Sequence, residues 1–342
     1  MAGFFRRLFK RGGNNQAPAL DLLDLLPEMP SEEWFNEDNA LPYPEWERIH
    51  DWMDENVAEP AHHEAYNVVA RQWMEQLATA GKRSLTTGES PHFMLCTHLD
   101  KPARQWVLKT AEEYRRSIFE TVGDLARSDR RGKHLLMVLE GGFYDRYLAH
   151  YYHGDYAGRS AGVMVSGDGY EHIAIIAPSG PEFDSPFRRV LAHEFSHKTL
   201  CDLKLPRWLD EGIAMYFEDK LGGGERSIAD RLGGHFEAVG TQALLREFRE
   251  WWTEDRMQGF WSGDLWNSEE DEQAFCYEMA RIIFGILRGI VGRESDRFRD
   301  FLKDVRREDA GEGSSRRHLR VSLGDMAEQF LGAGEWTPIP GW

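Results

Sequence analysis

The sequence has few cysteines, no long apolar run and a shortage of basic side chains, and each deficit argues against a class of protein. Its three cysteines, Cys96, Cys201 and Cys276, are an odd number, which argues against a disulfide-stapled secreted domain. No stretch approaches the roughly 20 apolar residues that cross a bilayer as a helix. Lysine and arginine number 41 against 58 aspartate and glutamate, a formal net charge of −17. Such a surface repels phosphate backbones, so we expect no nucleic-acid partner.

Residues 1–11 alternate aromatic and basic side chains. They lack the uninterrupted apolar core of a secretory signal peptide, so we expect a cytoplasmic protein. Two interpretations of this arm stay open: a disordered tail, or a segment that makes weak contact with a membrane surface.

The composition, 41% hydrophobic and 29% charged, is typical of a soluble globular protein. Its length suits two modest domains, or one large domain with extensions. We predict a flexible extension over residues 1–40, a helical segment over 41–90, a main domain over 91–310, and a C-terminal linker and tail over 311–342.

Apolar periodicity predicts strands early in the main domain and helices after them. Between the last two strands, Ser166-Gly167-Asp168-Gly169 suits a hairpin turn. Strands followed by helices indicate an α+β fold, with a small sheet packed on helices. The predicted strands are 92–97, 134–139, 161–165 and 172–177, and the predicted helices are 44–57, 64–80, 103–127, 186–201, 207–220, 229–252, 271–290, 295–306 and 322–331.

The most informative motif is His193-Glu194-Phe195-Ser196-His197, within one of these helices. Residues four apart share a helix face, so His193 and His197 can bind one metal ion together. Glu194 points about 100° away, which places a carboxylate beside the metal rather than on it. A base that takes a proton from metal-bound water must lie there.

A catalytic zinc site usually has a third protein ligand. Cys201 lies on the same stripe as the two histidines but about 12 Å along the helix from His193, too far for one tetrahedral ion. The metzincin spacing also fails, because Leu203 stands where a third histidine belongs. The following helix offers three carboxylates, Asp210, Glu211 and Glu218.

The histidine motif followed by Trp208-Leu209-Asp210-Glu211-Gly212-Ile213-Ala214 resembles the gluzincin metallopeptidases, the thermolysin-like peptidase MA superfamily. The resemblance implies a Zn²⁺ cofactor with Glu211 as its third ligand. It also implies a thermolysin-like catalytic domain over 91–310, in which a small mixed sheet precedes a mostly helical part carrying the zinc site. The implied reaction is the hydrolysis of a peptide or protein substrate.

The resemblance implies further roles outside the ligand set. Residues 160–165 match the edge strand that pairs with an extended substrate, and an ordinary sheet edge is the competing interpretation. Tyr277 matches the side chain that stabilises the oxyanion. His235 is a weaker candidate for that role, and His150 and His153 are candidate pocket residues or ordinary surface and core histidines.

Three functions follow from these patterns. The first is a zinc peptidase that uses Glu194 as its general base. The second is a non-catalytic zinc-containing peptide-binding or regulatory module. The third is a membrane-surface adaptor that acts through the N-terminal arm. The Gly-x-Met-x-Asn motif of related aminopeptidases is absent, which argues against an aminopeptidase.

Overall fold

The protein's structure is a computed structural model. It describes residues 26–30, 33–81, 85–126, 131–152, 160–178, 185–232, 235, 240–268, 270–292 and 295–341. The predicted arm over residues 1–11 lies outside these described residues.

A five-stranded mixed sheet forms the centre of the first half, in the order β3-β4-β5-β7-β6. Strands β4, β5 and β7 run parallel, and β3 and β6 add antiparallel to the two sides. The hairpin predicted at 166–169 is confirmed: Asp168 and Gly169 both have positive φ, as the two-residue turns that match strand twist require. The strands are β3 Thr86–Glu89, β4 Phe93–Thr97, β5 His134–Leu139, β6 Gly162–Gly167 and β7 Tyr170–Ile176.

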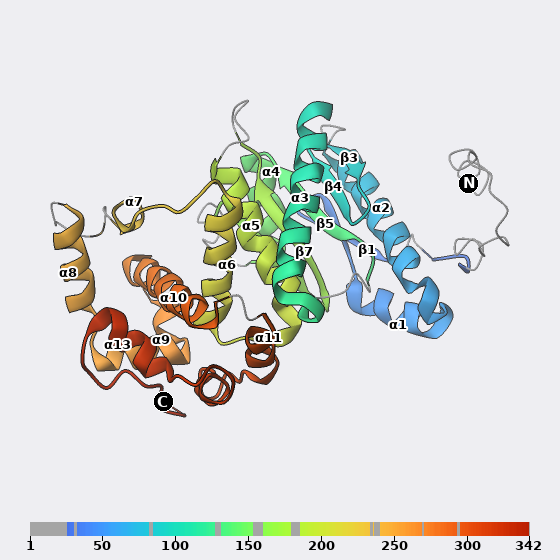
Figure 1. Ribbon diagram of the computed structural model, residues 1–342. Coiled ribbons are helices and arrows are strands. Elements are labelled where there is room, and N and C mark those ends of the chain that lie inside the picture. Colours follow the sequence, from blue (N-terminus) through green and yellow to red (C-terminus); the bar gives the residue numbers. More distant parts are fainter. Residues whose placement is uncertain are drawn as a thin grey trace, which may run out of the picture.

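The central strands β4 and β5 are apolar and buried at nearly every position. Both faces of the sheet are therefore covered. Alternate strand residues belong to two separate apolar cores, as the two-residue strand period requires. One core packs on α3 (Lys101–Val122) and α5 (Ser185–Leu200), and the other on α1 (Trp46–Asn56), α2 (His62–Ala80) and α4 (Gly141–Leu148). Figure 1 shows α1 and α2 on one side of the sheet and α5 on the other.

A small hairpin precedes α1, partly within the range predicted as a flexible extension. Its strands are β1 (Phe35–Asp38) and β2 (Leu41–Pro44), paired antiparallel. The Trp73 indole N–H donates to the Pro42 carbonyl at 2.7 Å, and the Tyr43 hydroxyl donates to the Tyr147 carbonyl at 3.0 Å. These bonds fix the hairpin on α2 and α4.

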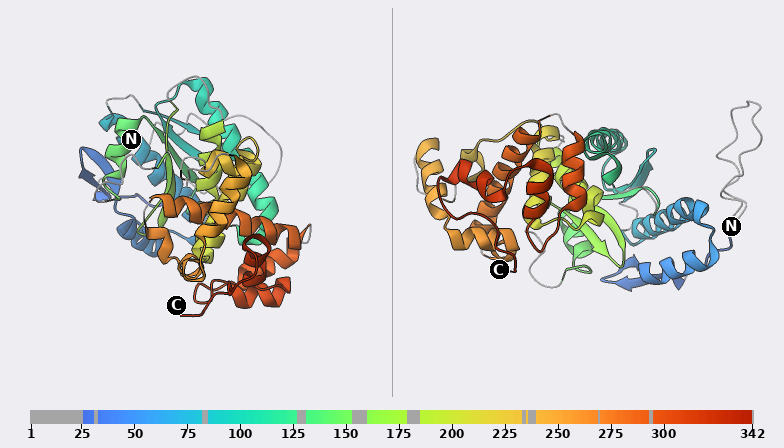
Figure 2. Two further views of the ribbon diagram at one scale, coloured as in Figure 1. Left: turned by 90° about the vertical axis from the view of Figure 1, so that its left-hand side faces the viewer. Right: turned by 60° about the horizontal axis from the view of Figure 1, so that its bottom comes forward.

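The second half is helical, so the predicted α+β class is confirmed. Most of its helices lie on the far side of α5 from the N-terminal elements (Figure 1 and the right-hand view of Figure 2). The helices of this half are α6 Arg207–Leu221, α7 Ile228–Leu232, α8 Thr241–Trp251, α9 Glu254–Ser262, α10 Glu270–Val291, α11 Ser295–Asp304, α12 Glu312–Ser314 and α13 Leu323–Leu331. Along the whole described chain, short 3₁₀-helical turns occur at Glu59–Ala61, Gly123–Leu125, Cys201–Leu203 and Asp264–Asn267, and a π-helical turn at Ser315–Leu319. Among the described residues, no helix combines the length and apolar character that a membrane span needs.

Two predictions for the C-terminal half differ from the structure, one for a helix and one for a linker. The single helix expected at 229–252 is two helices, α7 and α8, and Gly240 with φ 93° directly precedes α8. The linker expected from 311 is helical and packed: the buried Ser314 hydroxyl donates to the Phe301 carbonyl at 2.7 Å. Tertiary hydrogen bonds override the linker-like composition there.

Candidate metal centre

Helix α5 directs the two histidines of the motif, His193 and His197, away from the sheet core. Its Leu191, Ala192 and Phe195 are fully buried, and the Phe195 ring lies 5.2 Å from that of Phe93 on β4. This apolar stripe fixes the rotation of α5 about its axis. The motif's polar residues are thereby directed toward α6 and the edge of the sheet.

The side chains of His193, His197 and Glu211 converge on one point. The two imidazole Nε2 atoms are 3.1 Å apart, and each lies 3.4 Å from Glu211 Oε2. The ligand atoms of all three residues lie within 4.8 Å of one another. Their side chains are only 16%, 12% and 10% exposed, respectively. The structure therefore brings together the three residues expected as ligands.

A tight connection places Glu211 beside α5. Lys204 adopts a left-handed conformation after α5 ends, and Pro206 precedes the first residue of α6. The next residue after the carboxylate is Gly212, where an added Cβ would lie 2.9 Å from both the Ala280 carbonyl oxygen and Phe284 Cβ. Glycine therefore lets α6 and α10 pack in close contact behind the site.

Two further carboxylates lie beside the other nitrogens of the imidazoles, although His193 Nδ1 has no aligned hydrogen-bond partner among the described residues. Asp210 Oδ2 lies 3.1 Å from His197 Nδ1, and Glu218 Oε2 lies 3.4 Å from His193 Nδ1. A carboxylate at Nδ1 favours the tautomer whose Nε2 lone pair faces the centre. From the sequence, Glu218 is one of three candidate ligands. Its spacing of seven residues from Glu211, two helical turns, is the signal that places both on one face of α6.

The carboxylates make the centre favourable for positive charge. Burial by itself lowers the pKa of His193, but the adjacent carboxylates of Glu211 and Glu218 outweigh it and raise that pKa to about 9. Burial raises the pKa of Glu211, yet His197 and His193 hold it far below its ordinary value. Glu211 Oε2 is buried with no hydrogen-bond donor. A buried acceptor between two imidazoles fits a divalent cation, and the donor set of two nitrogens and one oxygen fits zinc.

No protein-family model matches this chain, and no curated protein matches it either. The geometry of the His193, His197 and Glu211 cluster is what indicates a metal centre.

Glu194 connects the centre to the edge strand. Its Oε2 accepts a hydrogen bond from the Met164 backbone N–H at 2.8 Å, and β6 is one of the two edge strands of the five-stranded sheet. The close approach depends on Gly162: an added Cβ would lie 2.3 Å from Val190 Cγ1 and 3.3 Å from Glu194 Cγ. Glycine at this position therefore lets the strand lie directly against α5.

Tyr277 lies in the neighbourhood of the centre, on the second turn of α10. Its ring centroid is 6.4 Å from that of His193 and 5.3 Å from that of Trp266. His235 pairs instead with Asp271 at 2.6 Å.

The remaining candidate residues are placed outside the ligand cluster. His150 stacks on Tyr43 and lies 2.9 Å from Asp38, on the N-terminal hairpin. His153 lies outside the described residues. The Cys201 thiol contacts the Lys198 carbonyl at 3.3 Å, at the end of α5.

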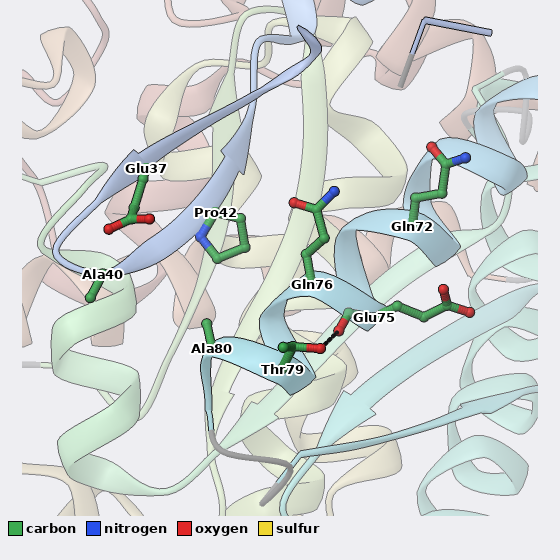
Figure 3. A pocket seen from close by; sticks show the side chains of 8 residues that line it. All are labelled: Glu37, Ala40, Pro42, Gln72, Glu75, Gln76, Thr79 and Ala80. Atoms are coloured by element: carbon green, nitrogen blue, oxygen red, sulfur yellow. Dashed lines mark hydrogen bonds between the residues drawn. The ribbon is translucent and has the colours of Figure 1, made fainter. Parts of the chain in front are cut away.

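Hollows lie on both sides of the cluster. A cavity of about 420 Å³ reaches Asp210 and Glu211 from the α9 side, and another of about 250 Å³ reaches His193 and Glu194 from the β6 side. A larger hollow of about 550 Å³ lies away from them, between the N-terminal hairpin and α2 (Figure 3). Its lining has no imidazole or thiol: Glu37, Ala40, Pro42, Gln72, Glu75, Gln76, Thr79 and Ala80.

Proposed function

We propose that this protein is a zinc-dependent peptidase with His193, His197 and Glu211 as metal ligands. The observation that carries the proposal is the convergence of three ligand atoms next to a carboxylate, Glu194, that contacts an edge strand. A structural zinc site is usually closed by a fourth protein ligand and has no use for such a carboxylate. A bound zinc ion would supply acidity to water and polarise a carbonyl group.

Glu194 acts as the general base. Its carboxylate is largely buried beside the imidazoles, one residue from His193. It accepts a proton from the attacking water and passes that proton to the nitrogen of the departing amine. Tyr277 is proposed to donate a hydrogen bond to the oxygen that gains negative charge, since it lies on the His193 side of the centre.

Strand β6 is proposed to hold the substrate. It pairs with β7 on one side only, so an extended peptide can add to its other side through backbone hydrogen bonds. Because Glu194 contacts this strand at Met164, a peptide bound along β6 passes next to the base. A peptide that binds along β6 does not require a motif that recognises a free amino terminus.

The test compares Glu194→Gln with the wild type in a mass-spectrometric peptide-library screen, with zinc measured in each sample. We expect Glu194→Gln to retain zinc and lose turnover, because the amide cannot accept the proton. Glu113→Gln, on the exposed side of α3, is the matched control and should keep both. His193→Ala should lose zinc. Equal cleavage by Glu194→Gln and the wild type refutes the base, and zinc-replete wild type that cleaves nothing refutes the peptidase.

A further inference from the structure

The cavity on the β6 side of the metal centre adjoins both a proposed ligand and the proposed base. It is lined by the end of the loop before β6, by the first residue of β6, by α5, by α6 and by the loop that follows α6. Under the proposed function, a group bound in it would lie beside the bond to be cleaved. Its lining residues are Ser160, Ala161, Gly162, Pro186, Arg189, Val190, His193, Glu194, Glu218 and Arg226.

Two guanidinium groups line this cavity, and they differ in how they are held. Arg189 is buried and fixed by Asp219 at 3.3 Å and by the Gly224 carbonyl at 2.5 Å. Arg226 donates from one nitrogen to Glu218 Oε1 at 2.8 Å, and its side chain is 43% exposed. The other donors of Arg226 have no hydrogen-bond acceptor among the described residues, and a guanidinium offers five.

Arginine side chains gather on one side of the cavity. Arg231, only 5% exposed, lies behind the cavity and shares Asp219 with Arg189. Three guanidinium groups, those of Arg189, Arg226 and Arg231, thus face two carboxylates, Glu218 and Asp219.

Nearby carboxylates balance these arginines. Asp230 interacts electrostatically with both Arg226 and Arg231, and Arg231 also lies 3.6 Å from Glu278, which is paired with Arg281. Arg226 is therefore distinguished by its exposure and its unused hydrogen-bond donors rather than by an uncompensated charge.

We propose that this cavity binds a carboxylate group of the substrate, and that Arg226 is the residue that selects it. The inference rests on the proposed function and names its substrate class. About 250 Å³ is below the range of roughly 300–1,000 Å³ for pockets that enclose a whole small ligand, and it suits one side chain or a chain terminus. A planar guanidinium binds a carboxylate through paired, charge-assisted hydrogen bonds.

The test measures binding, with cleavage prevented by Glu194→Gln. Zinc-loaded Glu194→Gln protein is titrated by calorimetry with acetyl-Ala-Ala-Glu-Ala-amide and with its Gln counterpart. A third peptide, acetyl-Ala-Ala-Ala-Ala with a free carboxyl terminus, is compared with its amide. We expect about tenfold tighter binding of one carboxylate peptide than of its neutral partner, and the pair that shows it identifies a side-chain or a terminal carboxylate.

Substitutions of Arg226 in the same background assign the preference. Arg226→Gln should reduce the tenfold ratio to about one, and Arg226→Lys should restore part of it, with zinc content unchanged in both. Arg246→Gln, at an exposed pair on α8, is the matched control. Equal affinities for both members of each pair, or a preference that survives Arg226→Gln, overturns the proposal. Carboxylate selection without cleavage by the wild type would support this cavity and refute the peptidase, so the two failures are distinguishable.

Discussion

The substitution Gly162→Ala separates metal binding from catalysis. The added Cβ would lie 2.3 Å from Val190 Cγ1, whereas carbon atoms in contact lie about 3.5–4.0 Å apart. Strand β6 and helix α5 must therefore move apart by more than about 1 Å, or the Val190 side chain must turn. The overpacking should lower the free energy of unfolding by about 1–3 kcal/mol.

The same movement shifts a peptide bound along β6 away from Glu194 and the metal ligands. It also lengthens the Met164 N–H to Glu194 Oε2 hydrogen bond from 2.8 Å to about 3.8 Å, beyond the upper limit of about 3.2 Å for such a bond. A misplacement of this size costs about 10²-fold in rate in other enzymes. The metal ligands lie on α5 and α6, so zinc content should not change.

The assay is the rate of peptide cleavage, with zinc content and urea unfolding measured on the same samples. Val190→Ala removes the Cγ1 atom that causes the overlap, so the double variant Gly162→Ala/Val190→Ala should recover most of the lost rate. An additive double variant, with the losses of both single variants, would show that the overlap is not the cause. Unchanged activity in Gly162→Ala would refute the dependence of catalysis on the approach of β6.

Three further predictions concern the surroundings of the site and the cores. Asp210→Asn and Glu218→Gln should each lower zinc affinity by about 10–100-fold, measured by competition with a chelator; changes below twofold in both would show that these carboxylates do not orient the imidazoles. Burial, together with Lys198, lowers the pKa of His172 to about 3, against about 6.5 in an unfolded chain. The unfolded state therefore binds a proton first as the pH falls, and the free energy of unfolding should drop from about pH 6.5 downward, by about 3 kcal/mol at pH 4.5. In metal-free His172→Gln, the free energy of unfolding measured with urea should lack this part of its decrease with falling pH. An unchanged pH dependence would contradict the assignment of the effect to His172. Gly212→Ala should destabilise the protein by about 1–3 kcal/mol, because its Cβ would overlap α10; an unfolding free energy equal to the wild type's would show that the two helices can separate freely.

The sequence predicted strands β4, β5, β6 and β7, most of the long helices and the two histidine ligands, because each depends on short-range pattern. His193 and His197 share a face on any α-helix, while the assignment of Glu211 came from the resemblance of the second motif. Glu218 was left among the alternatives, since its contact with His193 depends on how α5 and α6 cross, which spacing alone does not fix.

Elements without apolar alternation were missed. Strand β2 reads Leu41-Pro42-Tyr43-Pro44, and proline is unusual within strands. Strand β3 is Thr86–Glu89, a polar segment with a glycine. In the predicted linker, the Asp309 carboxylate accepts from the backbone N–H groups of Gly311 and Gly313, a local arrangement that holds a glycine-rich segment in place.

The hydrogen bond between Met164 and Glu194 has a consequence for the order of events under the proposed function. In the free protein, Glu194 occupies an outward-facing N–H of β6, which also protects part of an open strand from pairing with other chains. A peptide that adds to β6 competes for that N–H and displaces the carboxylate. Occupancy of the strand would then release the proton acceptor, so the protein would become reactive only when a chain is in place.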